Sequence, residues 1–212
     1  QTTNIDVTLK IEDDIKVEKV VTLNGETIEY EDTFNKEGTY VVTVTDDAQN
    51  TTSITFTIDK TKPKFEGLSS REAHVDGYTV DITDATETTI TVQKDHGDFA
   101  PITEGTAITE EGTYQLVAVD AAGNKYTTWV IVDRTEPSIA NTVDGEYINQ
   151  CTTVTIFDRY LNKVTINDDT YSRKDFSKNT KNENFKLEKE ICEDGTYTIT
   201  AIDKKGIPTT KT

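Results

Sequence analysis

A short motif occurs three times in this chain and constrains its fold more than any other feature. In each copy an acidic residue precedes Gly, Thr and Tyr, and alternating apolar positions then lead to an Asp, 8 positions after the Gly. The same register returns at each copy, so the sequence predicts an array of small repeated domains and not one large domain. The copies begin at Glu37, Glu111 and Asp194 and end at Asp46, Asp120 and Asp203.

The spacing of the motif predicts where the domains begin and end. The interval between successive copies suits a small β-sandwich. In the first two copies a second Asp, Asp59 or Asp133, is followed 4 positions later by a proline, Pro63 or Pro137. We therefore predict three domains, at residues 1–60, 61–134 and 135–212, which we call the first, second and third repeat. Short linkers stiffened by proline predict an elongated rod.

The apolar residues alternate with polar ones, which is the pattern of half-buried strands. Tyr40, Val42 and Val44 alternate in the first repeat, and a longer alternating run extends from Ile5 to Ile11. Thr, Val and Ile, which favour strands, dominate these segments. Two-sheet antiparallel sandwiches require this period of two with one polar face. The sequence therefore predicts an all-β fold of three tandem sandwiches.

The motif also resembles a known group of proteins. In the second repeat, Gly-Thr-Tyr is followed along the chain by Asp-Ala-Ala-Gly-Asn at Asp120–Asn124. The segment Asp-Arg-Thr-Glu-Pro then follows at Asp133–Pro137. This arrangement is similar to the tandem bacterial immunoglobulin-like repeats of secreted and cell-surface proteins, especially those of Gram-positive bacteria. The first repeat departs from it at Gln49 and the third at Ile207. The resemblance implies an exported, cell-surface or cell-wall-associated protein, and it assigns no binding role to any residue.

The tyrosine of the motif occupies the position of the tyrosine corner in immunoglobulin-like sandwiches. There the ring fills the end of the core and the hydroxyl bonds back to the main chain. The alternative is a packed core tyrosine without that hydrogen bond. The three candidates are Tyr40, Tyr114 and Tyr197.

Both cysteines of the chain, Cys151 and Cys192, lie in the third repeat. Cys151 opens the expected second strand and Cys192 closes the expected fifth, and these strands are antiparallel neighbours in the predicted sandwich. In an exported protein we therefore expect a disulfide within one sheet. The alternative is a pair of reduced, buried thiols in a cytosolic protein.

The strongly acidic composition limits the partners of the chain. A net charge of −17 opposes binding to nucleic acids or anionic membranes. No run of about eighteen apolar residues is present, so we expect no membrane insertion. The same carboxylates are suited to divalent cations, and Ca²⁺ is the one cofactor that the sequence suggests.

The acidic residues at the domain junctions are the candidate Ca²⁺ ligands. In stacked sandwiches the Asp that ends one domain approaches two loops of the next, so oxygen ligands converge there. The alternative is that Lys60, Lys62 and Arg134 in the linkers neutralise the same carboxylates. The expected ligands are Asp59, Asp84, Glu87, Asp120 and Asn124 at the first junction, and Asp133, Glu136, Asp158 and Asp203 at the second.

One sheet face of the second repeat is unusually apolar. Alignment with the first repeat places Trp129, Ile131, Val117 and Val119 on the outward face, and Trp129 is the only tryptophan of the chain. An exposed apolar face of this kind often binds a partner, and a tryptophan on it suits sugar rings. The alternatives are that residues 94–107 fold over the face, or that the register is shifted by one.

The sequence contains no phosphate-binding glycine loop, nucleophile motif or zinc-ligand spacing, and we expect no catalytic residues and no enzyme activity. The chain lacks Met, including an initiator, so we expect it to be a segment of a longer exported protein. We expect this segment to be monomeric. The best functional interpretation is a stalk or adhesion segment. One alternative is a module that binds carbohydrate or a host surface protein through the Trp129 face. The other is an accessory region of a secreted glycan-active enzyme.

Overall fold

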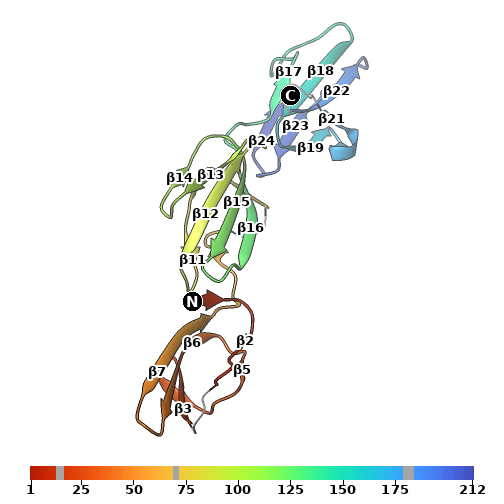
Figure 1. The fold of residues 1–212 in the computed structure, drawn as a ribbon. Coiled ribbons are helices and arrows are strands. Elements are labelled where there is room, and N and C mark those ends of the chain that lie inside the picture. The colour runs from red at the N-terminus through yellow and green to blue at the C-terminus, as the bar shows by residue number, and fades with distance from the viewer. Residues whose placement is uncertain (13–16, 69–71, 179–183) are drawn as a thin grey trace. The chain divides into compact units, whose positions relative to one another are not determined.

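The computed structural model describes residues 1–12, 17–68, 72–178 and 184–212, with side chains omitted for 72–74. Its regular structure consists of strands and one short 3₁₀ turn, η1 (Arg173–Asp175), which confirms the all-β prediction (Figure 1). Among the described residues, no helix is long and apolar enough to cross a membrane.

The chain separates into two compact units. Unit 1 comprises Gln1–Ala73, Thr79–Ile108 and Thr113–Val130, and unit 2 comprises His74–Tyr78, Thr109–Gly112 and Ile131–Thr212. These units do not follow the boundaries expected at residues 60 and 134, so the division into three domains stays a prediction.

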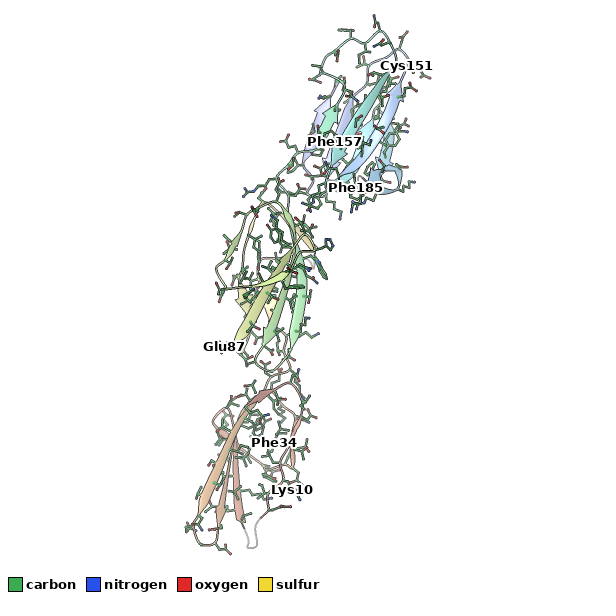
Figure 2. The ribbon with its side chains drawn as sticks, turned by 45° about the horizontal axis from the view of Figure 1, so that its top comes forward. Lys10, Phe34, Glu87, Cys151, Phe157 and Phe185 are labelled. Carbon is green, nitrogen blue, oxygen red and sulfur yellow. A yellow bond between two sulfur atoms is a disulfide. The ribbon has the colours of Figure 1, made fainter. Side chains whose placement is uncertain are left out.

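In unit 1, the first repeat forms a sheet in the order β1-β7-β6-β3-β4 and a smaller pair, β2-β5 (Figure 1). Phe34 of β5 (labelled in Figure 2) packs against Tyr40 of β6, and their ring centroids are 5.0 Å apart. Only two residues of the predicted strand at Ile5–Ile11 pair with β5, and Ile5 is 67% exposed. The strands are β1 (Thr2–Thr3), β2 (Val7–Thr8), β3 (Val17–Leu23), β4 (Glu26–Ile28), β5 (Thr33–Phe34), β6 (Gly38–Asp46) and β7 (Thr51–Ile58).

The second repeat contains a five-stranded sheet in the order β13-β12-β15-β16-β9 and two short strand pairs, β11-β8 and β10-β14. Ile90, Leu116 and Ala118 are buried on one face, in keeping with the period of two. The strands are β8 (Lys64–Phe65), β9 (Glu72–Val75), β10 (Tyr78–Thr79), β11 (Ile82–Thr83), β12 (Thr88–Lys94), β13 (Phe99–Ile102), β14 (Ala107–Ile108), β15 (Gly112–Asp120) and β16 (Lys125–Val132).

In unit 2, the third repeat has two four-stranded sheets, β17-β18-β22-β21 and β20-β19-β23-β24. Buried residues from both sheets form one apolar cluster, including Ile156 of β18 and Val164 of β19, as a sandwich requires. The strands are β17 (Ser138–Ala140), β18 (Thr152–Asp158), β19 (Leu161–Ile166), β20 (Asp169–Ser172), β21 (Ser177–Lys178), β22 (Phe185–Ile191), β23 (Ile199–Asp203) and β24 (Pro208–Lys211).

Candidate metal centres and linker contacts

Three aspartates of unit 1 converge where strands end. Asp59 follows β7, Asp84 follows β11 and Asp120 is the last residue of β15. Each offers a carboxylate oxygen, and these oxygens lie within 4.8 Å of one another. We call this group the first aspartate cluster. Glu87, which the sequence also suggested as a ligand, is exposed (Figure 2).

Hydrogen bonds already satisfy most of the first aspartate cluster. The main-chain and side-chain N–H groups of Asn124 each donate to one carboxylate oxygen of Asp120, both at 2.8 Å. The hydroxyl of Thr86 lies 3.0 Å from Oδ2 of Asp59 and 3.1 Å from Oδ1 of Asp84. Oδ2 of Asp84 is buried and has no hydrogen-bond partner. The negative charges of this cluster are therefore largely stabilised by neighbouring donors.

A second aspartate cluster lies in unit 2 at the corresponding positions of the repeat. Asp133 and Asp158 follow Asp59 and Asp84 at the interval that separates the first two copies of the motif. Asp203 follows Asp120 at the interval that separates the last two copies. The exposed fractions of Asp133, Asp158 and Asp203 are 2%, 5% and 0%. These three residues form the second aspartate cluster.

Main-chain N–H groups donate to the second aspartate cluster, including those of Thr135 to Asp133 and of Arg159 to Asp158. The N–H of Tyr160 donates to Oδ1 of Asp158 at 2.6 Å, and the N–H of Ile207 donates to Oδ1 of Asp203 at 2.8 Å. Oδ2 of Asp133 and Oδ2 of Asp203 are buried without a hydrogen-bond partner. A buried carboxylate oxygen without a partner is costly, because it has lost water and gained nothing in exchange.

Burial and mutual repulsion change the acidity of the second aspartate cluster. Burial, followed by the negative charges of Asp158 and Asp203, raises the pKa of Asp133 to about 6. Burial also raises the pKa of Asp158, and the charge of Asp203 adds to this effect. Asp133 and Asp158 are therefore buried acidic groups whose ionised forms are disfavoured by low solvation and by neighbouring negative charge.

A cavity of about 180 Å³ adjoins the second aspartate cluster. Asp133 and Asp158 line it together with Glu111, Thr135, Glu136 and Tyr160. Phe157 and Arg159 also form part of its wall, so a space large enough for several water molecules, with both polar and apolar lining, lies next to two of the buried carboxylates.

The same pair of linker contacts, which the residue pattern alone did not predict, occurs in both units. Glu37 accepts hydrogen bonds from the N–H of Lys60 at 2.5 Å and from the hydroxyl of Thr61 at 2.9 Å. These donors lower the pKa of Glu37. In unit 2, Glu111 accepts from the N–H of Arg134 at 3.1 Å and from the hydroxyl of Thr135 at 2.6 Å. The sequence signal for this contact is the acidic residue that precedes Gly-Thr-Tyr in the motif.

Lys60 and Arg134, two of the basic linker residues, have partners outside the aspartate clusters. The Lys60 ammonium group bonds to Asp6 at 2.7 Å and to the carbonyl of Asn35 at 2.8 Å. Nε of Arg134 donates to the carbonyl of Asp76 at 2.9 Å. Lys62 is exposed. The Lys60 ammonium group therefore does not neutralise the first aspartate cluster in this structure.

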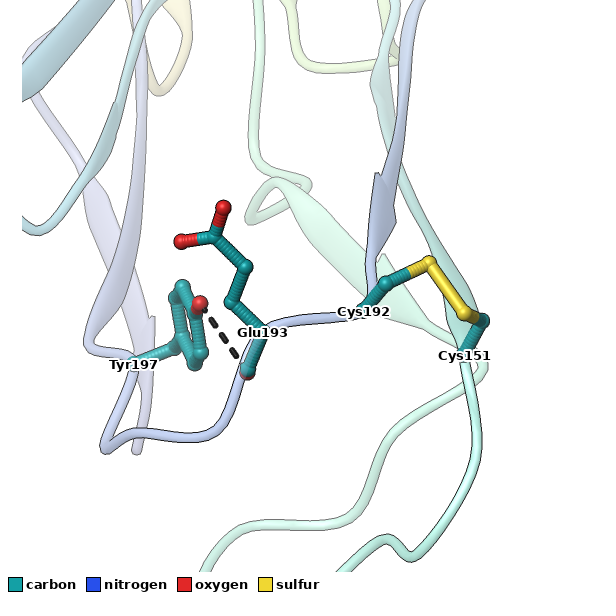
Figure 3. Close-up of a disulfide and its surroundings, with 4 residues drawn as sticks. All are labelled: Cys151, Cys192, Glu193 and Tyr197. Carbon is teal, nitrogen blue, oxygen red and sulfur yellow. Dashed lines mark hydrogen bonds between the residues drawn. A yellow bond between two sulfur atoms is a disulfide. The ribbon is translucent and has the colours of Figure 1, made fainter.

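The two cysteines form a disulfide (Figure 3). Their Cα atoms are 4.2 Å apart, and the residues next to them, Thr152 and Ile191, are directly opposite each other on β18 and β22. The bridge therefore joins neighbouring strands of one sheet.

The hydrogen bond that defines a tyrosine corner is present at Tyr40 and at Tyr197. The hydroxyl of Tyr40 donates to the carbonyl of Lys36 at 2.9 Å, and the hydroxyl of Tyr197 donates to that of Glu193 at 3.2 Å (Figure 3). Tyr114 is 7% exposed. The first and third repeats therefore share this feature of immunoglobulin-like sandwiches.

The exposed apolar face expected around Trp129 requires a correction. Ile131 is 4% exposed and Val117 is 9% exposed, so neither lies open to solvent, whereas Trp129 and Val119 are half-buried. A shift of the strand register by one residue does not explain this burial, because Val117 lies opposite Thr91 as the alternation requires. β15 is paired with β12 and β16, and β16 with β15 and β9, so both residues lie on inner strands of the sheet and not on an edge strand. Residues 99–102 extend the sheet as β13.

Comparison with known proteins gives no family assignment. No protein-family model matches the chain, and no curated protein matches its sequence. Among solved structures, it is similar to a Bacteroides ovatus protein, SGBP-B of the mixed-linkage glucan utilization locus, in complex with a mixed-linkage heptasaccharide. That match has 17% identity and a TM-score of 0.24, and it covers 98% of this chain and 59% of the other. The chain thus spans about 59% of that protein's length.

Two further similar structures are Dpr2 Ig1-Ig2 and the insect immune protein hemolin. Dpr2 Ig1-Ig2, solved in complex with DIP-Theta Ig1-Ig3, has 13% identity and a TM-score of 0.37, covering 99% of this chain and 93% of the other. The insect immune protein hemolin has 12% identity and a TM-score of 0.33, covering 99% and 72%. All three TM-scores are below 0.5. The assignment of tandem immunoglobulin-like sandwiches therefore rests on the sheets and the tyrosine-corner bonds.

Proposed function

We propose that this chain is a non-enzymatic stalk or adhesion segment of an exported bacterial surface protein, built from three sandwiches at residues 1–60, 61–134 and 135–212. The repeated linker contact is the observation that carries the proposal. A spacer has to restrict the segments between its domains, and in both units a glutamate holds the two residues that follow Asp59 or Asp133. Pro63 and Pro137, both buried, restrict the backbone a few residues further on.

A second set of contacts holds the carbonyl group at the end of each final strand. In unit 1, the side-chain amide of Asn124 donates to the carbonyl of Asp59 at 2.8 Å. In unit 2, the ammonium group of Lys205 donates to the carbonyl of Asp133 at 3.3 Å and also bonds to Asp76. Each linker is therefore held both by the repeat before it and by a turn of the repeat after it. This arrangement supports a mechanical role.

The disulfide and the charge support an extracellular location. Disulfides persist in oxidising compartments and are rare in the cytosol. A net charge of −17 keeps an extended surface protein soluble and opposes self-association. Attachment to a cell wall belongs to the same proposal.

The proposal is tested by measuring the motion of the linkers. In ¹⁵N relaxation experiments, we expect the amides of Lys60, Thr61 and Thr135 to have order parameters of about 0.85, the value of rigid backbone. Replacing Glu37 with Ala should lower the values at Lys60 and Thr61 and leave Thr135 unchanged, and Glu111→Ala should do the reverse. Order parameters below about 0.6 in the unmodified chain would contradict a stiff spacer.

A direct binding function remains the alternative, through half-buried Trp129. A screen of the chain against soluble glycans and host matrix proteins tests it, with Trp129→Ala as the matched variant. Binding that is lost in this variant would establish an adhesive module. Binding that survives would exclude Trp129 as the contact, and an absence of binding would favour a passive stalk.

A further inference from the structure

Basic residues gather in the third repeat of this acidic chain. Residues 135–212 contain half of the 22 Lys and Arg residues, although they make up little more than a third of the sequence. Within residues 171–178 and 184–189, five residues are basic and two are acidic, whereas the whole chain has 39 acidic residues. We call the five basic residues the basic strip: Arg173, Lys174, Lys178, Lys186 and Lys189.

The fold brings the basic strip to one edge of the sandwich in the third repeat. β20 and β21 are edge strands of its two sheets, and η1, which contains two residues of the strip, lies between them along the chain. β22 pairs with β21, so that Ser177 is opposite Lys186 and Lys178 is opposite Phe185 (labelled in Figure 2). The strip therefore lies where the chain passes from one sheet to the other.

Aromatic rings lie beside several cations of the basic strip. Cζ of Arg173 is 3.4 Å from the centroid of the Phe185 ring, and Nζ of Lys178 is 5.8 Å from the same centroid. Nζ of Lys189 is 4.4 Å from the centroid of the Tyr171 ring. Cations within about 6 Å of a ring centroid are attracted to it. The rings therefore help to hold these positive charges in a defined arrangement.

The two acidic residues of the same segments leave an excess of positive charge. Oδ2 of Asp175 accepts a hydrogen bond from the main-chain N–H of Ser172 at 2.9 Å. Oε1 of Glu188 lies 3.0 Å from Nζ of Lys186. The strip residues on η1 and β21 are exposed, and those on β22 are half-buried. The edge therefore presents more positive than negative charge to solvent.

We propose that the basic strip is a binding surface for a sulfated polysaccharide. Guanidinium and ammonium groups donate charge-assisted hydrogen bonds to oxyanions, and these are stronger than bonds between neutral groups. A sulfated polysaccharide has anionic groups along its length, so one chain meets several of these cations together. A stiff spacer needs no such surface, so this inference goes beyond the proposed function and does not depend on it.

The arrangement and setting of the basic strip favour this ligand. The cations are distributed over η1, β21 and β22, which suits a polymer better than one small anion. The Cys151–Cys192 disulfide of the same repeat supports an extracellular location, where sulfated polysaccharides occur. The acidic residues elsewhere in the chain do not prevent binding, because exposed charges more than about 8 Å apart are largely screened at physiological ionic strength.

The test is isothermal titration calorimetry of the full chain with a heparin oligosaccharide. We expect a dissociation constant of about 10⁻⁶ to 10⁻⁴ M in about 150 mM NaCl, as for electrostatic binding to other polyanions, and binding at least about tenfold tighter in about 50 mM NaCl. Neutral dextran should not bind. Polyglutamate of equal charge should bind at least about tenfold more weakly, and equal binding would overturn the assignment to a polysaccharide.

Lys174→Ala combined with Lys178→Ala is the decisive variant, and Lys36→Ala combined with Lys125→Ala is its matched control. The two double variants change the net charge equally, and all four lysines are exposed. We expect K174A/K178A to weaken heparin binding at least about tenfold and the control to change it less than about twofold. Equal weakening would show that net charge governs binding and would overturn the proposal. If the double variant does not fold, K174A alone replaces it.

Two further measurements locate the contact and identify the partner. In ¹⁵N-resolved spectra, the heparin oligosaccharide should shift the amides of Lys174, Lys178 and Lys186 far more than those of Lys36 and Lys125. Shifts outside the basic strip, or no binding at low salt, would overturn the proposal. Sedimentation velocity at low salt should show no self-association. Self-association that is lost in K174A/K178A would instead assign the strip to a second copy of this chain.

Discussion

The side-chain amide of Asn124 donates a hydrogen bond to the main-chain carbonyl of Asp59, 65 residues earlier, at 2.8 Å. The same amide donates to a carboxylate oxygen of Asp120 at 2.8 Å, and Asn124 is itself buried. The asparagine of the Asp-Ala-Ala-Gly-Asn motif therefore does more than form a tight turn. It connects the turn between β15 and β16 to the end of β7.

Replacing Asn124 with Ala should destabilise unit 1 by about 1–3 kcal/mol, because the variant leaves buried acceptors without a donor. Urea denaturation measures this loss. Asn50→Ala is the matched control, since Asn50 bonds the equivalent Asp46 in an exposed turn and should cost less than about 1 kcal/mol. Equal losses in the two variants would show that the bond to Asp59 contributes nothing.

Removing the hydroxyl of Tyr40 should cost about 0.5–1.5 kcal/mol, because the carbonyl of Lys36 loses its donor while the ring stays in place. The ring of Tyr40 stacks on Phe56 with centroids 5.0 Å apart, so Tyr40→Ala should cost about 3–5 kcal/mol. Chemical denaturation of Y40F and Y40A separates the two contributions. A Y40F variant as stable as the unmodified chain would leave only the packing role.

Replacing both cysteines with Ser should destabilise unit 2 by about 4 kcal/mol, because the disulfide spans 41 residues and restricts the unfolded chain. Residue-resolved hydrogen exchange measures the effect in each unit separately. Amides of β18 and β22 should exchange faster in the double variant, while those of β6 and β7 in unit 1 should not change. Faster exchange in both units would indicate that they unfold together.

The carboxyl group of Asp46 should titrate below the ordinary range of an aspartate. Hydrogen bonds from Asn50, first from its side chain and then from its main chain, lower the pKa of Asp46. Since the folded-state pKa is lowered, the stabilising contribution is present above the unfolded pKa and is lost as pH falls through the folded value. A carbon-detected NMR titration of Asp46 should show the low value, and Asn50→Ala should raise it. No change in that variant would assign the shift to another cause.

The burial of Ile131 also has a measurable consequence. Ile131→Ala should cost about 2–4 kcal/mol, as for a buried aliphatic side chain, although the alternating pattern places Ile131 on the outward face. Val20 on β3 is 43% exposed and provides the control, since Val20→Ala should cost less than about 0.5 kcal/mol. Similar small losses in both variants would restore the exposed face that the sequence predicted.

Much of the fold was readable in the sequence because the signals are local. Alternation in Gly38–Asp46 predicts a strand with Tyr40 and Val42 inside, and the structure buries both. The positions of Cys151 and Cys192 relative to their strands predicted a bridge within one sheet. The strand predicted at Ile5–Ile11 was too long, since only Val7 and Thr8 have a paired partner in β5.

The sequence by itself determined the all-β class, the repeated sandwich pattern and the recurrence of the same aspartates at the intervals of the motif. Those features follow from residue type and spacing, which act along the chain. Only the tertiary structure decided which carboxylate oxygens have donors and whether Val117 and Ile131 meet solvent. Hydrogen bonding and burial depend on groups that are distant in sequence, so Thr86 satisfies Asp59 while Oδ2 of Asp133 is left without a partner.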